Sequence, residues 1–211
     1  MKNKKDKEKK LKEINGKWKD ECKCELKKTA TQAVIGSGNP DANIIFIGEA
    51  PGKNEDKQGI PFVGSAGKFL NEMLEEIKMK REDVYITNIV KYRPPNNRDP
   101  EPKEKDDCRE WLHEELNLIS PKLIVFLGRH SMNDFFPIER ISEIHGKLLI
   151  KKFANISCNH FFALYHPAAA LYNNSMRDVL IQDFKKLPKV LEKIEKTEAK
   201  LPFFVSDDYL K

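Results

Sequence analysis

Short apolar runs alternate with amphipathic segments along the chain. The runs are rich in Ile, Val, Leu and Phe, as buried strands are, and they cover residues 44–47, 84–86, 123–127, 148–150 and 161–164. Between them, apolar residues recur at helical spacing over 66–78 and 103–118, and a third helix is expected over about 175–196, broken or kinked at Pro188. This alternation predicts the α/β class, a three-layer α/β/α sandwich around a central, mainly parallel sheet.

Polar loops follow four of these predicted strands and are the first candidates for a functional site. They begin after Ile47, Thr87, Leu127 and Leu164. Because ligands gather at the carboxyl ends of strands in such sheets, these loops should line one cleft. The first, GEAPGKNEDKQGIPFVGSAG over 48–67, holds five glycines, two prolines and the acids Glu49 and Glu55. With Phe62 as a flat apolar surface, it predicts a pocket for a planar polar ligand.

The loop over 86–102, ITNIVKYRPPNNRDPEP, combines a buried amide with positive charge. Asn88 ends a predicted buried strand, where an unpaired amide costs about 1–3 kcal/mol, so it either caps a neighbouring turn or faces a ligand. Lys91, Arg93 and Arg98 stand among prolines, and a rigid cationic loop of this kind suits phosphates. A solvated loop without a partner is the alternative.

The loop over 165–178, YHPAAALYNNSMRD, contributes a histidine. His166 ends a predicted buried strand and Pro167 begins a short predicted helix. The imidazole should therefore point into the same cleft as Glu49 and Asn88. The other four histidines have no comparable setting in the sequence; they are His113, His130, His145 and His160.

Length and composition suit a single compact domain, since 39% of the 211 residues are hydrophobic. We expect a monomeric domain over 16–196, a disordered basic arm over 1–15 and a C-terminal tail over 197–211. The arm either binds a polyanion or is a solvated tail without a partner. Leu201–Phe204 in the C-terminal tail either docks on a partner such as a replication clamp or folds back onto the domain.

Two further expectations concern compartment and redox state. Neither a secretory signal nor a membrane span is recognisable, and we therefore expect a cytoplasmic protein. Four cysteines in such a chain argue for free thiols or metal ligation more than for disulfides; they are Cys22, Cys24, Cys108 and Cys158.

Several motifs together resemble the type-4 uracil-DNA glycosylases. They are GEAPG, PFVG with AG following, VYITNIVK with RPP and NRDP, and HPAAAL, and the resemblance covers roughly residues 20–190 in the order and spacing of that family. It implies an enzyme that flips uracil out of DNA and hydrolyses its N-glycosidic bond in base-excision repair. The alternative is a binding module with the glycosylase fold that holds DNA or a flipped base without cutting it. Strand preference and activity on other deaminated bases stay open.

The resemblance also implies roles for particular residues. Phe62 matches the aromatic residue that stacks on the base, and Asn88 matches the asparagine that reads its edge. Glu55 would lie near the position of the thymine methyl group, and His166 matches the histidine that donates to uracil O2. Ala50 stands where related glycosylases have an aspartate, so Glu49 is our candidate for positioning the attacking water, with capping of its own loop as the alternative.

The resemblance is incomplete at an iron–sulfur site. Type-4 members hold a four-iron cluster with four cysteines, and Cys24 and Cys108 match two of them. Tyr92 and Glu21 occupy the other two positions, with Cys22 displaced by one residue. A tyrosine is a poor substitute for a soft thiolate. We therefore expect the cluster to be absent. The alternative, a retained cluster, requires both that Cys22 shifts into register and that a non-cysteine or absent fourth ligand is tolerated. We expect the glycosidic chemistry to need no cofactor.

Overall fold

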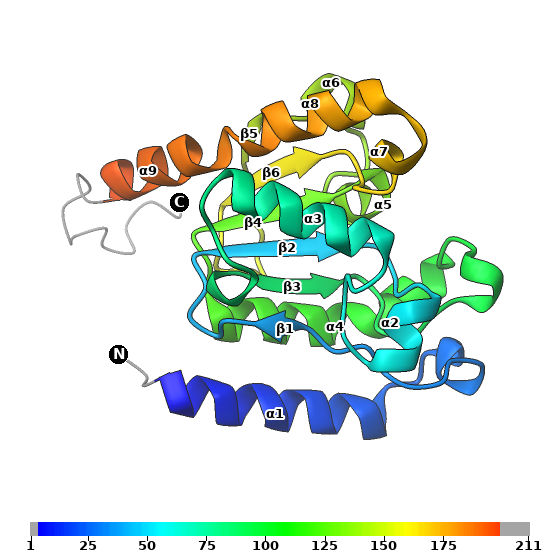
Figure 1. Ribbon diagram of the computed structural model, residues 1–211. Coiled ribbons are helices and arrows are strands. Elements are labelled where there is room, and N and C mark those ends of the chain that lie inside the picture. The colour runs from blue at the N-terminus through cyan, green and yellow to red at the C-terminus, as the bar shows by residue number, and fades with distance from the viewer. Residues whose placement is uncertain (1–3, 199–211) are drawn as a thin grey trace.

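The computed structural model describes residues 4–198 and centres on a six-stranded sheet in the order β1-β3-β2-β4-β6-β5 (Figure 1). The strands are β1 Ser37–Gly38, β2 Ile44–Gly48, β3 Tyr85–Asn88, β4 Leu123–Leu127, β5 Leu148–Ile150 and β6 His160–Leu164. The four central strands are parallel, and β1 and β5 pair antiparallel at the two edges. All five predicted strands are confirmed; β1 is too short to have left an apolar pattern.

Helices cover both faces of the sheet, which confirms the predicted three-layer sandwich. They are α1 Lys4–Glu21, η1 Glu25–Lys28, α2 Lys53–Gln58, α3 Ser65–Glu76, η2 Arg81–Asp83, η3 Pro95–Asn97, α4 Pro102–Ile119, α5 Arg129–Phe135, α6 Ile141–Ile144, α7 Ala169–Tyr172, α8 Asn174–Phe184 and α9 Leu187–Glu198. Among these described residues, no helix is both long and apolar enough to cross a membrane.

Side chains that alternate along β2 divide the core into two halves, as the pleat of a strand requires. Ile45 and Ile47 pack with α1, α4 and α5. Ile44 and Phe46 pack on the opposite face with α3, α8 and α9, where the ring of Phe46 stacks on Phe184 at 5.5 Å between centroids. With both faces covered, polar loops emerge only at the ends of the strands.

The helix expected over about 175–196 is divided into α8 and α9, as the proline predicted. Pro188 is the second residue of α9, and its missing amide hydrogen costs nothing there because the first turn of a helix has no internal acceptor for it.

The expectation of a disordered basic arm over 1–15 is wrong for the part that the structure describes. Residues 4–21 form helix α1, which lies along the same side of the sheet as α4 (Figure 1). Leu11, Ile14, Asn15 and Trp18 form a stripe at helical spacing, and the last two are buried. The Lys7 ammonium also pairs with Asp41 at 2.8 Å. Leu201–Phe204 lies outside the described residues.

Candidate active site

The carboxyl ends of the parallel strands open into a cavity of about 380 Å³. The cavity is lined by six residues singled out in the sequence: Glu49, Ala50, Glu55, Phe62, Asn88 and His166. They come from the loops after β2, β3 and β6, whose carboxyl ends lie at one edge of the sheet (Figure 1). The structure thus brings these residues together around one site, and Arg98 joins them at the rim.

Asn88 presents an unsatisfied acceptor to this cavity. The residue is 1% exposed, and its Oδ1 atom has no hydrogen-bond partner among the described residues. A Cβ atom on Gly48 would lie 2.4 Å from this oxygen and 2.6 Å from the ring of Phe62, so only glycine fits beside them. Since an unpaired buried acceptor costs about 1–3 kcal/mol, Oδ1 is arranged for a donor that arrives with a ligand.

The ring of Phe62 forms a wall of the cavity and depends on a strained backbone. Its φ angle is 53°, in the left-handed region that non-glycine residues rarely adopt. The guanidinium of Arg81 donates to the Phe62 carbonyl at 3.1 Å, to the Pro61 carbonyl and to Asn71 Oδ1 at 3.1 Å. These bonds hold the loop so that the Phe62 ring stands 5.9 Å from that of His166, between centroids.

Glu55 is held rigidly at the cavity rather than left free to move. Its Oε1 accepts hydrogen bonds from the backbone amides of Val63 and Gly64 at 3.0 and 2.8 Å. The side chain is a long one, but two bonds to the neighbouring loop give it a fixed position. It can therefore act as a steric wall.

His166 is a neutral donor. Burial lowers its pKa to about 4, with the nearby His130 as the next contribution. Its Nδ1 accepts a hydrogen bond from the backbone amide of Ala168 at 3.1 Å, so the single proton of the neutral ring is on Nε2. The ring thus offers an N–H donor to the cavity at neutral pH, without positive charge.

The carboxyl group of Glu49 has a raised pKa and is a weaker acid than an ordinary glutamate. Burial, and then the negative charge of Asp99, raise its pKa to about 7, while Lys105 and Arg129 act in the opposite direction. Its Oε1 is buried and has no hydrogen-bond partner among the described residues, which leaves nothing in its own loop for that oxygen to cap. The group therefore exchanges a proton near neutral pH, as groups at active sites often do.

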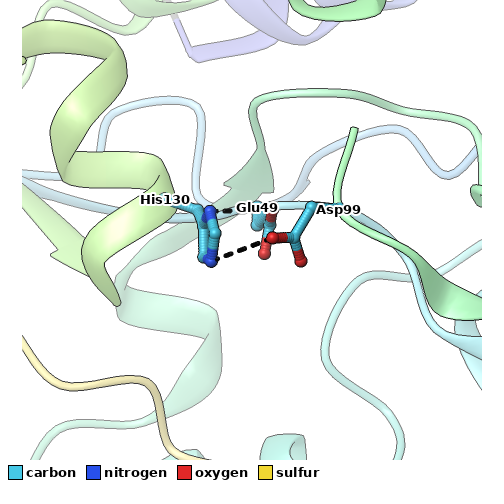
Figure 2. Close-up of side chains that lie close together, drawn as sticks. All are labelled: Glu49, Asp99 and His130. Atoms are coloured by element: carbon cyan, nitrogen blue, oxygen red, sulfur yellow. Dashed lines mark ion pairs between the residues drawn. The ribbon is translucent and has the colours of Figure 1, made fainter. Parts of the chain in front are cut away.

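His130 approaches Glu49 from the start of α5, and the sequence analysis missed it (Figure 2). Its Nδ1 lies 3.4 Å from Glu49 Oε1, and its Nε2 lies 3.4 Å from Asp99 Oδ2. A signal for it exists, because His130 is the second residue of α5 and comes shortly after Leu127, one of the four strand ends expected to line the cleft.

The predicted cationic loop needs a correction at Lys91. This side chain is 2% exposed and pairs with Glu115 at 2.5 Å, and Glu115 also accepts from the hydroxyls of Tyr85 and Thr87. A buried, paired ammonium cannot reach a phosphate in solution, so Lys91 joins the loop to α4 instead.

The two arginines of this loop remain near the surface. Arg98 makes a two-pronged contact with Glu104 at 2.8 and 2.6 Å, and Arg93 donates to Asn97 Oδ1 at 2.7 Å. Both guanidinium groups are thus partly engaged but keep free donors.

Three cysteines and the tyrosine that replaces a fourth lie together beside α1. Hydrogen bonding to Cys22 and Cys24 raises the pKa of Cys108, and the same contact lowers that of Cys22 to about 6. Burial, and then the three thiols, raise the pKa of Tyr92 to about 12. The chain thus offers three soft ligands and one phenol that resists ionisation, which does not fit a cluster held by four thiolates. Cys158 is buried elsewhere in the core.

The fold and the cavity define a member of the uracil-DNA glycosylase superfamily. The family described as "Uracil DNA glycosylase superfamily" matches residues 35–194 of this chain. Three relatives, each described as "Type-4 uracil-DNA glycosylase", indicate which family within this superfamily the chain is most similar to. The chain is 48% identical to that of Sulfurisphaera tokodaii over 171 residues, which cover 78% of this chain and 77% of the relative.

The other two relatives are from Archaeoglobus fulgidus and Thermotoga maritima. The former is 46% identical, over 83% of this chain and 90% of its own, and the latter 38% identical, over 81% and 88%. The chain belongs to the type-4 uracil-DNA glycosylase family, which confirms the resemblance found in the sequence.

Proposed function

We propose that this protein is a monofunctional uracil-DNA glycosylase, which flips uracil out of DNA and hydrolyses its N-glycosidic bond, leaving an abasic site for base-excision repair. One observation carries the proposal: the unpartnered Oδ1 of Asn88 and the Nε2–H of neutral His166 serve the same cavity, beside the ring of Phe62. An acceptor, a donor and an aromatic surface match the N3–H, the O2 and the flat face of uracil.

Base recognition follows from these groups. Stacking on Phe62 recovers about 1–3 kcal/mol of what unstacking the base costs. Asn88 Oδ1 accepts from uracil N3–H. The unprotonated N3 of cytosine is itself an acceptor, so this orientation of the Asn88 amide disfavours cytosine. Glu55, fixed by two backbone amides, forms a wall against the thymine methyl group, and Ala50 leaves room beside the base.

Cleavage breaks the bond between C1′ and N1 and leaves the electron pair on uracil. The Nε2–H of His166 donates to O2, where this negative charge accumulates, and a neutral imidazole suits the task because it remains a donor throughout. Glu49, in its ionised form, holds the water whose oxygen bonds to C1′ and accepts the proton of that water. The chain's own residues thus supply the whole reaction, without a cofactor.

We propose further that the chain does not hold the four-iron cluster of its family. Tyr92 and the buried thiols of Cys22, Cys24 and Cys108 support this, since one of four ligands is a phenol with a raised pKa. Anaerobically purified protein should contain no stoichiometric iron or sulfide and no absorbance band near 400 nm. Stoichiometric iron and sulfide, together with an absorbance band near 400 nm, would overturn this part of the proposal.

The DNA surface includes Arg93 and Arg98 on the loop that borders the cavity. Phosphate contacts from these guanidinium groups would hold the strand while the base enters the pocket. We infer a monomer acting on uracil-containing DNA in the cytoplasm, and the clamp contact expected of Leu201–Phe204 stays a prediction.

The activity is tested with single- and double-stranded oligonucleotides that carry one uracil. Wild-type protein should produce alkali-labile abasic sites, and Asn88→Ala and His166→Ala should each slow their formation by about 100-fold or more. Tight binding of these oligonucleotides with no abasic product would instead identify a binding module that does not cut DNA.

A further inference from the structure

His130 lies beside two carboxylates that belong to different parts of the fold. Glu49 directly follows β2 and Asp99 follows η3, and the two carboxylates lie on the same side of the ring (Figure 2). Each ring nitrogen faces one of them at 3.4 Å. The side chains of His130 and Glu49 are only 29% and 21% exposed, while that of Asp99 is 66% exposed. Glu49 and His130 therefore meet where both side chains are partly buried.

Arg129 and Asp99 both approach Nε2 of His130, and the contact with Arg129 is the shorter, at 3.0 against 3.4 Å. The Nε of Arg129 donates to His130 Nε2 at 3.0 Å, so Nε2 is the acceptor of the neutral ring. Its proton is then on Nδ1, the atom that faces Glu49 Oε1. This is the opposite tautomer to that of His166, whose Nδ1 is the acceptor.

We propose that His130 is a positioning residue for Glu49, whose carboxylate it holds by donating from Nδ1 to Oε1. This inference rests on the proposed function, in which Glu49 positions the attacking water. With Oε1 held by the imidazole, Oε2 is the oxygen left for the water. The contact of 3.4 Å is longer than an ordinary hydrogen bond, and such contacts often tighten once substrate fills the site.

The need for such a donor follows from burial. Glu49 Oε1 has no hydrogen-bond partner among the described residues as the protein stands without DNA, and a carboxylate turning freely in a cavity would hold a water poorly. A misplacement of about 1 Å at a reacting group can slow a reaction by about 100-fold. One donor that fixes one oxygen removes this freedom.

The charged groups around Glu49 come from three elements. Asp99 in the loop raises the pKa of Glu49, whereas Lys105 on α4 and Arg129 on α5 lower it. Burial lowers the pKa of both His130 and His166 below the ordinary value, which favours the neutral ring in both. A hydrogen bond to the ionised carboxylate favours ionisation. Removing the His130 donor should therefore raise the pKa of Glu49.

Two substitutions separate the two ring nitrogens. The amide nitrogen of His130→Asn reaches about as far as Nδ1 and can still donate to Glu49, whereas that of His130→Gln reaches about as far as Nε2. We expect His130→Ala and His130→Gln to slow single-turnover excision by about 10- to 100-fold, and His130→Asn to recover most of the loss. The Kd for DNA should stay within about twofold of wild type in all three.

The matched control is His160→Ala, at the amino end of β6 and away from the cavity, which should excise at the wild-type rate. Equal rates for His130→Asn and His130→Gln, or a His130→Ala rate within about twofold of wild type, would overturn the proposal.

A second measurement does not depend on activity. The Glu49 carboxyl carbon is titrated by ¹³C NMR without DNA, with Glu49→Gln identifying its signal. His130→Ala should raise the titration midpoint and His130→Asn should leave it close to wild type. A midpoint that His130→Ala lowers or leaves unchanged refutes the contact. If wild-type protein fails to excise uracil, the proposed function falls, and this titration still decides whether His130 donates to Glu49.

Discussion

The raised pKa of Glu49 makes the proposed water-positioning group a source of instability, which substitution with glutamine should reveal. Burial and Asp99 raise this pKa from 4.5 to about 7. Each pKa unit corresponds to about 1.4 kcal/mol, so ionising Glu49 in the folded protein costs up to about 3.5 kcal/mol. Because its side chain is 21% exposed, solvent screening reduces this and we expect about 2 kcal/mol.

The direction follows from linkage. The folded protein holds the Glu49 proton more tightly than the unfolded chain does, so this stabilising contribution is fully present below about pH 4.5 and is lost as pH rises through about 7. Glutamine cannot ionise and lacks this dependence. Between about pH 5 and pH 8.5, Glu49→Gln should therefore gain about 2 kcal/mol of stability relative to wild type, while losing excision activity.

The assay is urea unfolding of both proteins across this pH range, with a linear extrapolation to water at each pH. Glu114→Gln, an exposed position on α4, is the control and should follow wild type throughout. Parallel curves of unfolding free energy against pH for wild type and Glu49→Gln would refute the assignment of a raised pKa to Glu49.

Three further predictions follow from packing. Gly48→Ala places a methyl group 2.4 Å from Asn88 Oδ1, and excision should fall by about 100-fold, measured in single turnover, with the melting temperature lowered. Lys91→Met leaves the buried carboxylate of Glu115 unpaired and should cost about 3–5 kcal/mol in urea unfolding, whereas an unchanged stability with weaker DNA binding would restore Lys91 to the DNA surface. Trp18→Ala should cost about 3–5 kcal/mol by the same assay, because the indole is 1% exposed; no cost would favour a disordered arm.

The sequence predicted the sheet and the contents of the cavity because both follow from local patterns. Apolar runs mark the buried strands, and the carboxyl ends of parallel strands meet at one edge, which brought Glu49, Asn88 and His166 together. Phe62 and Glu55 lie in the glycine-rich loop that the composition already marked. These predictions needed no knowledge of tertiary contacts.

The features that the sequence did not predict depend on contacts between segments that are distant in the chain. Lys91 turns inward because Glu115, 24 residues later, is there to pair with it. His130 is likewise a candidate site residue only because Glu49 and Asp99, which are remote from it in sequence, lie beside its ring. Helix α1 was missed because its apolar stripe is narrow and stands among lysines. Local composition therefore suggested disorder where packing provides a partner.

The central claim is tested most directly by measuring free uracil released from an oligonucleotide that carries a single uracil, together with the abasic strand. Wild-type protein should release one uracil for each abasic site formed and should release neither thymine nor cytosine from matched oligonucleotides. Asn88→Ala and His166→Ala should each reduce the rate by about 100-fold or more. Wild-type protein that releases no uracil, or variants that release it at the wild-type rate, would contradict the account.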